Sequence, residues 1–298
     1  MTRAIVVGGG SIGMRHARVL TGLGHEVVVV TQRTDLDVPA VASVADAGDA
    51  GYAVVATETA RHAASVTELA DAGFAGLLLV EKPLGVDPAS LGGFERVGVA
   101  FNLRFHPVIA ALAAALDGRR CLTVEAYVGQ HLSTWRPDRP VAEQYSAHQE
   151  RGGGALRDLS HELDYLVHLF GNCTGVFARG GRYGEVTVDA DDAWGIVAEH
   201  ERAPLVTVQL NYLDTTTRRR LVINTGAETL EADLVAGTLT IDGETTAHES
   251  DRDHSYRALH VAMLGDGAGV TSVDEAAVTD ALIERIERSA ASREWVTA

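Results

Sequence analysis

The stretch Ala4-Ile5-Val6-Val7-Gly8-Gly9-Gly10-Ser11-Ile12-Gly13 decides the fold that this sequence predicts. An apolar, strand-like run leads directly into a hexapeptide of the form G-x-G-x-x-G, and residues 11–23 then read as a helix. The hexapeptide alone is a weak signal, but between a strand and a helix it is typical of a turn that binds the phosphates of a dinucleotide. Gly8 permits the tight bend, Gly10 lets the backbone approach a pyrophosphate, and Gly13 allows close helix–strand packing. The cofactor contacts expected from this turn are Gly8, Gly10, Ser11, Ile12 and Gly13.

Short apolar runs alternate with helical stretches over the first third of the chain. The runs are 4–7, 26–31, 52–56 and 76–80, and a helix is expected over 60–72. Continuous apolar strands separated by helices indicate strands that are covered on both faces. We therefore expect an α/β domain over residues 1–118, built on a doubly wound, parallel Rossmann sheet.

The pattern changes after about residue 120. One helix over 155–170 is followed by strand-like runs, and the chain closes with a helix over 273–290. The runs are 176–183, 193–200, 205–213, 221–224, 229–234 and 238–241. The run 205–213 alternates apolar and polar residues, which indicates a strand covered on one face only. Residues 119–298 are therefore expected to form an α+β domain with a large, mostly antiparallel open sheet.

The charge balance argues against several classes of partner. Against 25 Lys plus Arg stand 41 Asp plus Glu, which gives a formal net charge of −16 and a pI near 5.1. Nucleic acids and anionic membranes bind clustered basic residues, so neither is expected as a partner. Cys121 and Cys173 have neither zinc nor disulfide-framework spacing, and the longest apolar run, 108–116, is too short for a membrane span. With no secretory segment before the first strand, we expect a cytoplasmic protein without a metal site.

The end of the second strand, residues 31–34 (TQRT), lies where a dinucleotide site reads the adenosine ribose. Sites for NAD usually place Asp or Glu there, to accept a hydrogen bond from the 2′-hydroxyl. Here no acid occurs until Asp35, whereas Thr31 and Arg33 are suited to holding a 2′-phosphate. NADP is therefore favoured, with NAD as the alternative if Arg33 is only a solvated loop charge.

Lys82 is the single lysine of the chain, so arginine supplies the other 24 (25 − 1) of its basic residues. It lies in Glu81-Lys82-Pro83, directly after the apolar run 76–80, and thus at the carboxyl end of a parallel strand, where open α/β sheets bind ligands. Lysine is a compact donor, whereas arginine is a wide planar fork that stays protonated. We interpret Lys82 as a functional residue; the alternative is that one lysine survived by chance.

Together with the glycine turn, four further segments resemble the Gfo/Idh/MocA oxidoreductases (glucose–fructose oxidoreductase, inositol dehydrogenase and rhizopine catabolism proteins). They are Ala56-Thr57 followed by His62, Glu81-Lys82-Pro83, 101–107 (FNLRFHP) and 152–164 (GGGALRDLSHELD). In that family the lysine of the E-K-P segment contacts the reacting hydroxyl and the nicotinamide ribose, and an Asp and a His after the second glycine-rich turn complete the site. The resemblance implies these catalytic roles for Lys82, Asp158 and His161, and cofactor contacts at Thr57, His62, Glu81 and Lys82.

The sequence departs from the family pattern at two places. The family usually has four residues from that Asp to that His, but Asp158 and His161 are three apart. In a continuous helix one missing residue turns a side chain by about 100°. Either Asp158 lies before the helix starts, or its role is weakened. Glu58 also replaces the proline that is common after Thr57, which leaves the shape of that loop open.

His161, Asp164 and His168 fall at i, i+3 and i+7, on one face of the expected helix. Three interpretations compete: catalysis by His161 with two structural neighbours, an entirely structural polar face, or a metal site. We favour catalysis. The sequence H-E-L-D-Y is not H-E-x-x-H, so a metalloprotease is not supported.

Four more residues are candidates for substrate contacts. Asn102 and Arg104 begin the passage to the second domain, where Arg104 is suited to a hydroxyl, carboxylate or phosphate but equally to domain packing. Tyr145 and His148 lie in the loop before the second glycine-rich turn, with a plain surface loop as the alternative. The full set of expected substrate contacts is Lys82, Asn102, Arg104, Tyr145, His148, Asp158 and His161.

The sequence thus predicts an NAD(P)-dependent oxidoreductase that interconverts a secondary alcohol and a ketone on a sugar, amino sugar, cyclitol or nucleotide sugar. His161 is expected to act as general base or acid, Lys82 to donate to the substrate oxygen, and Asp158 to orient the pair. The uncovered face of the second sheet suits a homo-oligomer, a dimer or tetramer. Two alternatives stay open: a redox-assisted glycoside hydrolase or lyase that keeps a bound NAD, and a non-catalytic dinucleotide sensor.

Overall fold

The computed structural model describes residues 2–298 and divides the chain into two compact units. The first unit comprises Met1–Phe105 and Arg252–Ala277, and the second comprises His106–Asp251 and Val278–Ala298. Each unit therefore contains two separate stretches of the chain.

This division differs from the single boundary expected near residue 118. Helix α3 (Pro107–Leu116) precedes that position but belongs to the second unit. The segment 252–277 returns to the first unit, because α6 (His254–Leu264) buries Met263 and its apolar neighbours against the first sheet.

The first unit contains a six-stranded parallel sheet, as the apolar runs predicted. Its strands are β1 (Arg3–Val7), β2 (Glu26–Val30), β3 (Ala40–Val41), β4 (Tyr52–Val55), β5 (Leu77–Val80) and β6 (Arg96–Val99). Their order is β3-β2-β1-β4-β5-β6, and every neighbouring pair is parallel. The strand order reverses between β1 and β4, and the carboxyl ends of strands at such a point are where doubly wound sheets bind dinucleotides.

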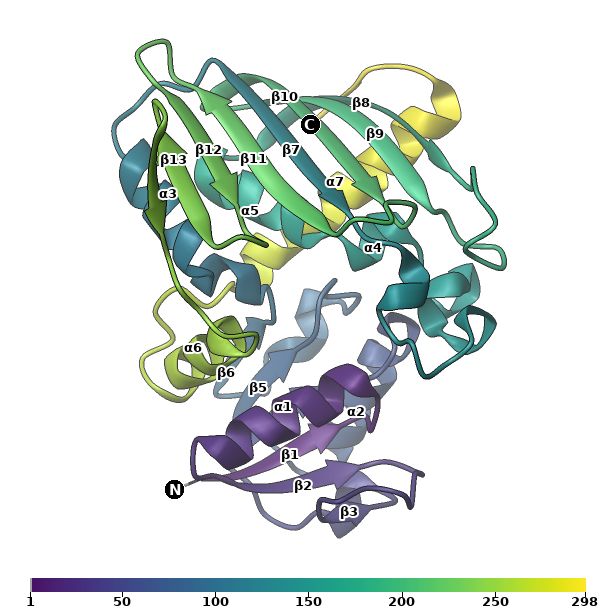
Figure 1. Ribbon diagram of the computed structural model, residues 1–298. Helices are drawn as coiled ribbons and strands as arrows, with labels where there is room; N and C mark the ends of the chain where they lie inside the picture. Colours follow the sequence, from purple (N-terminus) through teal and green to yellow (C-terminus); the bar gives the residue numbers. More distant parts are fainter. Residues whose placement is uncertain (1) are drawn as a thin grey trace. The chain divides into compact units, whose positions relative to one another are not determined.

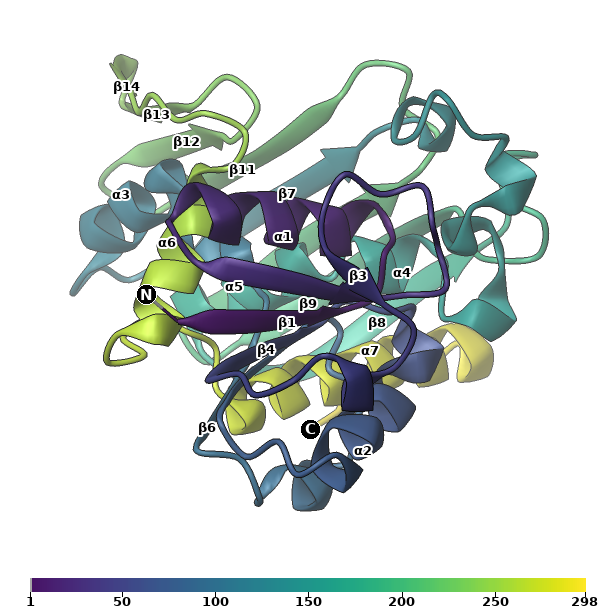
Figure 2. The ribbon, with the colours of Figure 1, turned by 90° about the horizontal axis from the view of Figure 1, so that it is seen from below.

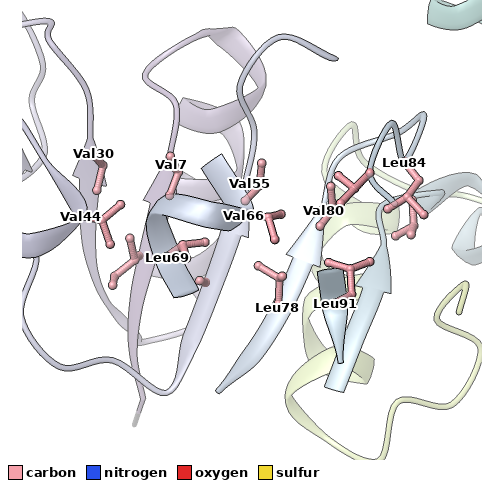
Figure 3. Close-up of a cluster of buried hydrophobic side chains, with 14 of the residues drawn as sticks. Val7, Val30, Val44, Val55, Val66, Leu69, Leu78, Val80, Leu84 and Leu91 are labelled. Carbon is pink, nitrogen blue, oxygen red and sulfur yellow. The ribbon is translucent and has the colours of Figure 1, made fainter. Parts of the chain in front are cut away.

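Helices cover both faces of this sheet. α1 (Ser11–Gly22) lies alongside β1 and β2 (Figure 2), and with α6 it packs on one face through Ala17, Leu20 and Leu259. α2 (His62–Asp71) packs on the other face, where Val66 and Leu69 face Val7 and Val55 (Figure 3). Burial on both faces explains why these strands are apolar at nearly every position.

The second unit contains a nine-stranded sheet. Its strands are β7 (Thr123–Gly129), β8 (Cys173–Gly181), β9 (Ala193–His200), β10 (Ala203–Asn211), β11 (Arg218–Asn224), β12 (Thr229–Asp233), β13 (Thr238–Ile241), β14 (Glu244–Ala247) and β15 (Val296–Thr297). The order is β14-β13-β12-β11-β7-β10-β9-β8-β15, with β7 parallel to β10 and the other pairs antiparallel. The mostly antiparallel open sheet predicted from the sequence is confirmed.

Helices lie against one face of this sheet only. Figure 1 shows α3, α5 (His161–Phe170) and α7 (Val273–Ser292) on the same side of the strands. In β10 buried and exposed residues alternate over positions 206–210, with Val206 and Val208 buried and Thr207 exposed. The half-covered strand pattern expected from the sequence is therefore present.

The remaining short elements lie in the connections. They are α4 (Ala155–Asp158) and 3₁₀ turns at Val44–Asp46, Thr59–Arg61, Pro88–Leu91, Asn102–Phe105, Leu132–Thr134, Val141–Glu143, Tyr145–Ala147 and Gln149–Arg151. Within residues 2–298, no helix combines the length and the apolar character that crossing a membrane requires.

Candidate active site

The glycine turn connects β1 to α1 at the carboxyl edge of the first sheet. Gly8 has φ +119°, and a Cβ there would lie 2.5 Å from the carbonyl oxygen of Ala56 at the end of β4. A Cβ on Gly13 would overlap the carbonyl oxygen of Gly8. Only glycine fits these two positions, as expected for a tight turn and close packing.

The space beside Gly10 is open, whereas other atoms lie close to Gly8 and Gly13. Among residues 2–298, no atom outside Gly10 and its two chain neighbours lies within 4 Å of the position that a Cβ on Gly10 would take. Gly10 is also the N-cap of α1, and the first helical hydrogen bond runs from the Met14 amide to its carbonyl. The amides of a helix's first turn have no partner within the helix and favour an anion. The turn therefore fits a dinucleotide pyrophosphate, which would occupy the space over Gly10.

Thr31 and Arg33 lie directly beside this turn. A Cβ on Gly9 would come within 2.5 Å of the Thr31 hydroxyl oxygen, which itself accepts a hydrogen bond from the Arg33 amide. The Arg33 guanidinium donates to the Gly9 carbonyl at 2.8 Å. It also donates to both carboxylate oxygens of Asp35, at 2.9 and 2.7 Å. Hydrogen bonding to Arg33 lowers the pKa of Asp35, so this carboxylate stays ionised.

His62 connects the loops that follow β4 and β5. Its Nδ1 lies 3.1 Å from the Leu84 carbonyl and its Nε2 lies 3.3 Å from the Thr57 carbonyl. Its side chain is fully buried, and this burial lowers its pKa. The direct cofactor contact expected for His62 does not fit this burial; the residue instead ties two loops together. Thr57, which is partly exposed at the loop surface, keeps its place as a candidate contact.

Lys82 follows β5 at the same carboxyl edge and is partly exposed, whereas Glu81 is buried. One carboxylate oxygen of Glu81 accepts from the Lys82 backbone amide at 3.1 Å. The other lies 2.8 Å from Nε2 of His16 in α1. Burial alone would raise the pKa of Glu81, but its interactions with His16, and after them those with Lys82, outweigh burial and hold the pKa below its ordinary value. Glu81 is therefore a support for Lys82, and its burial argues against the cofactor contact expected for its side chain.

Asn102 and Arg104 are engaged within the first unit. The Asn102 amide donates to the Ser255 hydroxyl at 2.6 Å, and Asn102 is buried. Arg104 donates to Glu275 at 2.7 Å. Asn102 thus anchors α6, and Arg104 holds the first turn of α7. These contacts favour the packing alternative for Arg104 and give Asn102 a structural task.

Asp158 is the centre of a hydrogen-bonded group in the second unit. The Tyr145 hydroxyl donates to one of its oxygens and the Tyr212 hydroxyl to the other, both at 2.7 Å. Burial, followed by the charge of Asp158, raises the pKa of both phenols well above its ordinary value, so they remain donors. Tyr145, expected to contact substrate, is thus brought to Asp158, while Tyr212 was not anticipated.

The helix expected over 155–170 is interrupted. α4 ends at Asp158, Leu159 leaves the helical conformation with ψ 22°, and α5 begins at His161. Asp158 therefore lies before the helix that carries His161, which is the first of the two alternatives that the short spacing left open. The spacing of three residues does not turn one side chain around a continuous helix.

Asp191 fixes the start of α4 and was not anticipated from the sequence. Its carboxylate accepts from the Leu156 amide at 3.0 Å and from the Trp194 indole at 2.6 Å. A Cβ on Gly154, where φ is +115°, would collide with the same carboxylate. The second glycine-rich turn therefore permits Asp191 to cap the helix that ends in Asp158.

The histidines of this region divide into different environments. His161 is partly exposed at the start of α5, Asp164 is buried and His168 is exposed. Among residues 2–298 no group of three or more His, Cys, Asp or Glu side chains is arranged to hold a metal ion, so the metal interpretation of this face has no support. His148 contacts the Ala142 carbonyl at 2.7 Å, within its own loop.

Comparisons with known proteins agree with this architecture. Residues 110–231 match the family model of the GFO/IDH/MocA C-terminal domain. No curated protein matches the chain in sequence. Among solved structures, a levoglucosan dehydrogenase in complex with NADH and L-sorbose has a TM-score of 0.83 at 17% identity, covering 100% of this chain and 98% of that one.

Two further structures are similar over nearly their whole length. GenD2 from gentamicin A biosynthesis, in complex with NAD, has a TM-score of 0.79 at 21% identity, with 99% of this chain and 96% of that chain covered. UDP-N-acetylglucosamine 3-dehydrogenase GnnA from Acidithiobacillus ferrooxidans has a TM-score of 0.78 at 19% identity, with 98% of each chain covered. The family model over residues 110–231 and the fold shared along the whole chain agree with the resemblance of the sequence to the Gfo/Idh/MocA oxidoreductases.

Proposed function

We propose that the protein is a nicotinamide-dependent dehydrogenase that interconverts a secondary alcohol and a ketone on a sugar or a related polyhydroxylated molecule. The observation that carries this proposal is the open space over Gly10, at the N-terminus of α1, on the same sheet edge as the single lysine. A phosphate-binding turn without chemistry nearby would serve a sensor equally well. Lys82, partly exposed and supported by buried Glu81, adds a polarising group at that edge.

The residues take complementary roles in this proposal. A bound nicotinamide would accept the hydride in oxidation and return it in reduction. The Lys82 ammonium donates a hydrogen bond to the substrate oxygen and stabilises its developing negative charge. His161 takes the hydroxyl proton in oxidation and gives it back in reduction, as an imidazole near neutral pH can. Asp158 accepts hydrogen bonds from Tyr145 and Tyr212, which hold its negatively charged carboxylate in a fixed position.

The substrate class is supported by the names of structurally similar proteins. They include a complex with L-sorbose, a complex with levoglucosan and a UDP-N-acetylglucosamine dehydrogenase. Their low identity leaves the particular sugar open, so the assay must be a panel. Sugars, amino sugars, cyclitols and nucleotide sugars are offered with NAD⁺ and NADP⁺, and reduced cofactor is followed by its absorbance.

Substitution of the single lysine tests the catalytic assignment. Lys82→Arg and Lys82→Met are expected to keep the fold and measurable binding of reduced cofactor but to lose most of the turnover. Wild-type kcat in either variant would remove Lys82 from the mechanism. Conversion of a sugar without accumulation of reduced cofactor would instead indicate the redox-assisted hydrolase or lyase. Tight cofactor binding without conversion of any sugar would indicate the sensor.

We propose NADP as the preferred cofactor, with Arg33 as the 2′-phosphate contact. Asp35 opposes this choice, because its carboxylate pairs with the same guanidinium. Both side chains are exposed, however, and an exposed ion pair contributes only about 0–1 kcal/mol. A doubly charged phosphate would displace it. Arg33→Ala should therefore weaken NADPH binding more than NADH binding, and Asp35→Asn should strengthen NADPH binding. Equal losses for both cofactors in Arg33→Ala would rule out Arg33 as the phosphate contact.

We also propose that the uncovered face of the second sheet forms a homo-oligomer interface. This face is hollowed over β7, β8, β9 and β10, and the hollow is lined by Tyr127, Tyr183, Val197 and neighbouring residues. Tyr183 and Val197 are exposed apolar side chains in this hollow. Light scattering after size exclusion should give a multiple of the chain mass, and Val197→Arg should lower it. A monomer in the wild type would contradict the proposal.

A further inference from the structure

A buried chain of polar side chains runs through the first unit and ends at the residue next to Lys82. Its members are Glu81, His16, His260 and Tyr52. We call it the buried histidine chain. Its four residues come from the end of β5, from α1, from α6 and from the start of β4. His16 and His260 are in contact although they lie 244 positions apart in the sequence. All four side chains are buried.

The hydrogen bonds have one consistent direction. The Tyr52 hydroxyl is fully buried, and its one hydrogen bond among residues 2–298 is to Nδ1 of His260, at 2.9 Å. A buried hydroxyl that does not donate loses a hydrogen bond, so Tyr52 donates and Nδ1 of His260 accepts. Nε2 of His260 then carries the proton and donates to Nδ1 of His16, at 2.8 Å.

The last link ends on a carboxylate. With Nδ1 accepting, Nε2 of His16 carries the proton and donates to Glu81, also at 2.8 Å. Every donor in the chain therefore points toward Glu81, and both imidazoles are neutral. Burial holds the pKa of His260 well below its ordinary value, which agrees with a neutral His260 ring.

The chain is unsuited to carrying protons to or from water. Its far end, Tyr52, has no exposed surface and lies in the apolar cluster that the sheet forms with α1 and α6. The chain is also unnecessary for packing, since matched apolar side chains would fill the same space without the cost of burying polar groups. What it provides is a fixed set of dipoles aimed at one carboxylate.

That carboxylate is the immediate support of the lysine. Its second oxygen accepts from the Lys82 amide, and its negative charge attracts the Lys82 ammonium. Two other ionisable groups lie near this pair. The charge of Glu81 acts on His62 of α2, and the Tyr256 ring of α6 meets the His16 ring edge to face, with the Arg15 guanidinium over the Tyr256 ring. The dominant partners of Glu81 are thus His16 and Lys82.

We propose that the buried histidine chain positions Lys82 for catalysis by holding the Glu81 carboxylate in one orientation and one charge state. This inference rests on the proposed function for its catalytic part only. His16 and His260 are positioning residues, since they act on Lys82 through Glu81. Through His260, the buried histidine chain also connects α6 to the residues that position Lys82. α6 belongs to the first unit although it lies far from the rest of that unit in the sequence.

The single lysine makes a direct test possible without any substrate. Protein labelled with ¹³C and ¹⁵N in lysine gives one side-chain signal, that of Lys82. His16→Leu and Glu81→Gln should both shift this signal and its pH titration. His16→Gln should restore it, because an amide can donate to Glu81 and accept from His260. The control His248→Leu lies in the second unit and should leave the signal unchanged. A wild-type signal in His16→Leu would overturn the proposal.

The catalytic part is tested by kinetics in the same variants. His16→Leu should lower kcat by up to about 100-fold, the usual effect of a misplacement of roughly 1 Å, with little change in cofactor KM. Without the His16 hydrogen bond Glu81 is protonated at higher pH, so the acid limb of the pH–rate profile should move to higher pH. In His16→Gln the acid limb should move back to its wild-type position.

A shifted lysine signal with unchanged kcat and pH profile would contradict positioning for catalysis. An inactive wild type whose lysine signal responds as expected would contradict the proposed function and leave the chain's action on Lys82 intact.

Discussion

Substitution of Gly10 by alanine is the sharpest test of the cofactor site, because it separates binding from folding. Gly10 has φ −76° and ψ −178°, a conformation that alanine adopts without strain. In the described part of the chain, residues 2–298, no atom beyond the two neighbouring residues lies within 4 Å of the added methyl group. Alanine gains about 0.4–1 kcal/mol by restricting the unfolded chain but loses a similar amount as an N-cap. The two effects nearly cancel, so the free energy of unfolding should change by less than about 1 kcal/mol.

Binding should respond very differently. The methyl group of Gly10→Ala would enter the space that a pyrophosphate takes over the first turn of α1. We expect the Kd for reduced cofactor to rise by at least about tenfold, which corresponds to about 1.4 kcal/mol. Cofactor titration by calorimetry gives the Kd. Urea unfolding must be followed by circular dichroism, because Trp135, Trp194 and Trp295 all lie in the second unit and do not report on the first.

Two alanine variants serve as controls for this experiment. Gly22→Ala lies at the other end of the same helix, also with no atom within 4 Å, and should bind cofactor as the wild type does. Gly13→Ala collides with the Gly8 carbonyl and should lose both stability and binding. A Kd for Gly10→Ala within about twofold of the wild-type value would show that no phosphate occupies this space, and the cofactor site would have to lie elsewhere.

Three further predictions concern polar side chains buried in the two units. Glu162 is fully buried and pairs with Arg219 at 2.7 Å, so Arg219→Met should cost about 3–5 kcal/mol in urea unfolding followed by tryptophan fluorescence. The double variant with Glu162→Gln should recover much of that loss, and a cost below about 1 kcal/mol would contradict this account. Tyr212→Phe removes a hydrogen bond to buried, charged Asp158 and should cost about 1.5–3 kcal/mol in the same assay, together with a lower kcat. The pKa of His260 lies well below its ordinary value of 6.5 in the folded protein. As pH falls, this histidine is therefore protonated in the unfolded state at a higher pH than in the folded state, so the stability of the first unit should fall as pH drops below 6.5. His260→Gln should flatten this dependence in calorimetry at pH 7.5 and 5.5; an equal slope in both proteins would refute it.

Much of the first unit was predictable because its signals are local. Residues 4–13 contain a strand, a turn and the start of a helix. The backbone conformation of each is set by residues close to it in the sequence. The carboxyl-edge position of Lys82 followed from the same strand–helix alternation. In the second unit, the alternation over 205–213 predicted a strand covered on one face, because one-sided burial leaves a period of two in the sequence.

The sequence failed where contacts join distant segments. The boundary near 118 missed the return of 252–277, since an ordinary amphipathic helix such as α6 has no mark of the sheet on which it packs. His62 was expected to contact the cofactor, yet its two ring nitrogens face backbone carbonyls inside the unit. The capping of α4 by Asp191 was likewise hidden, because this carboxylate comes more than 30 residues after the Leu156 amide that it accepts from.

The sequence alone determined the two-part architecture and the glycine turn between β1 and α1, and it predicted a role for the single lysine. These depend on apolar periodicity and on glycine, whose effects act within a few residues. Only the tertiary structure decided which polar groups support the candidate catalytic residues: His16 and His260 behind Glu81, and Tyr212 behind Asp158. The physical reason is that a sequence pattern records whether a side chain is buried, whereas its hydrogen-bond partner is set by how distant elements meet in space.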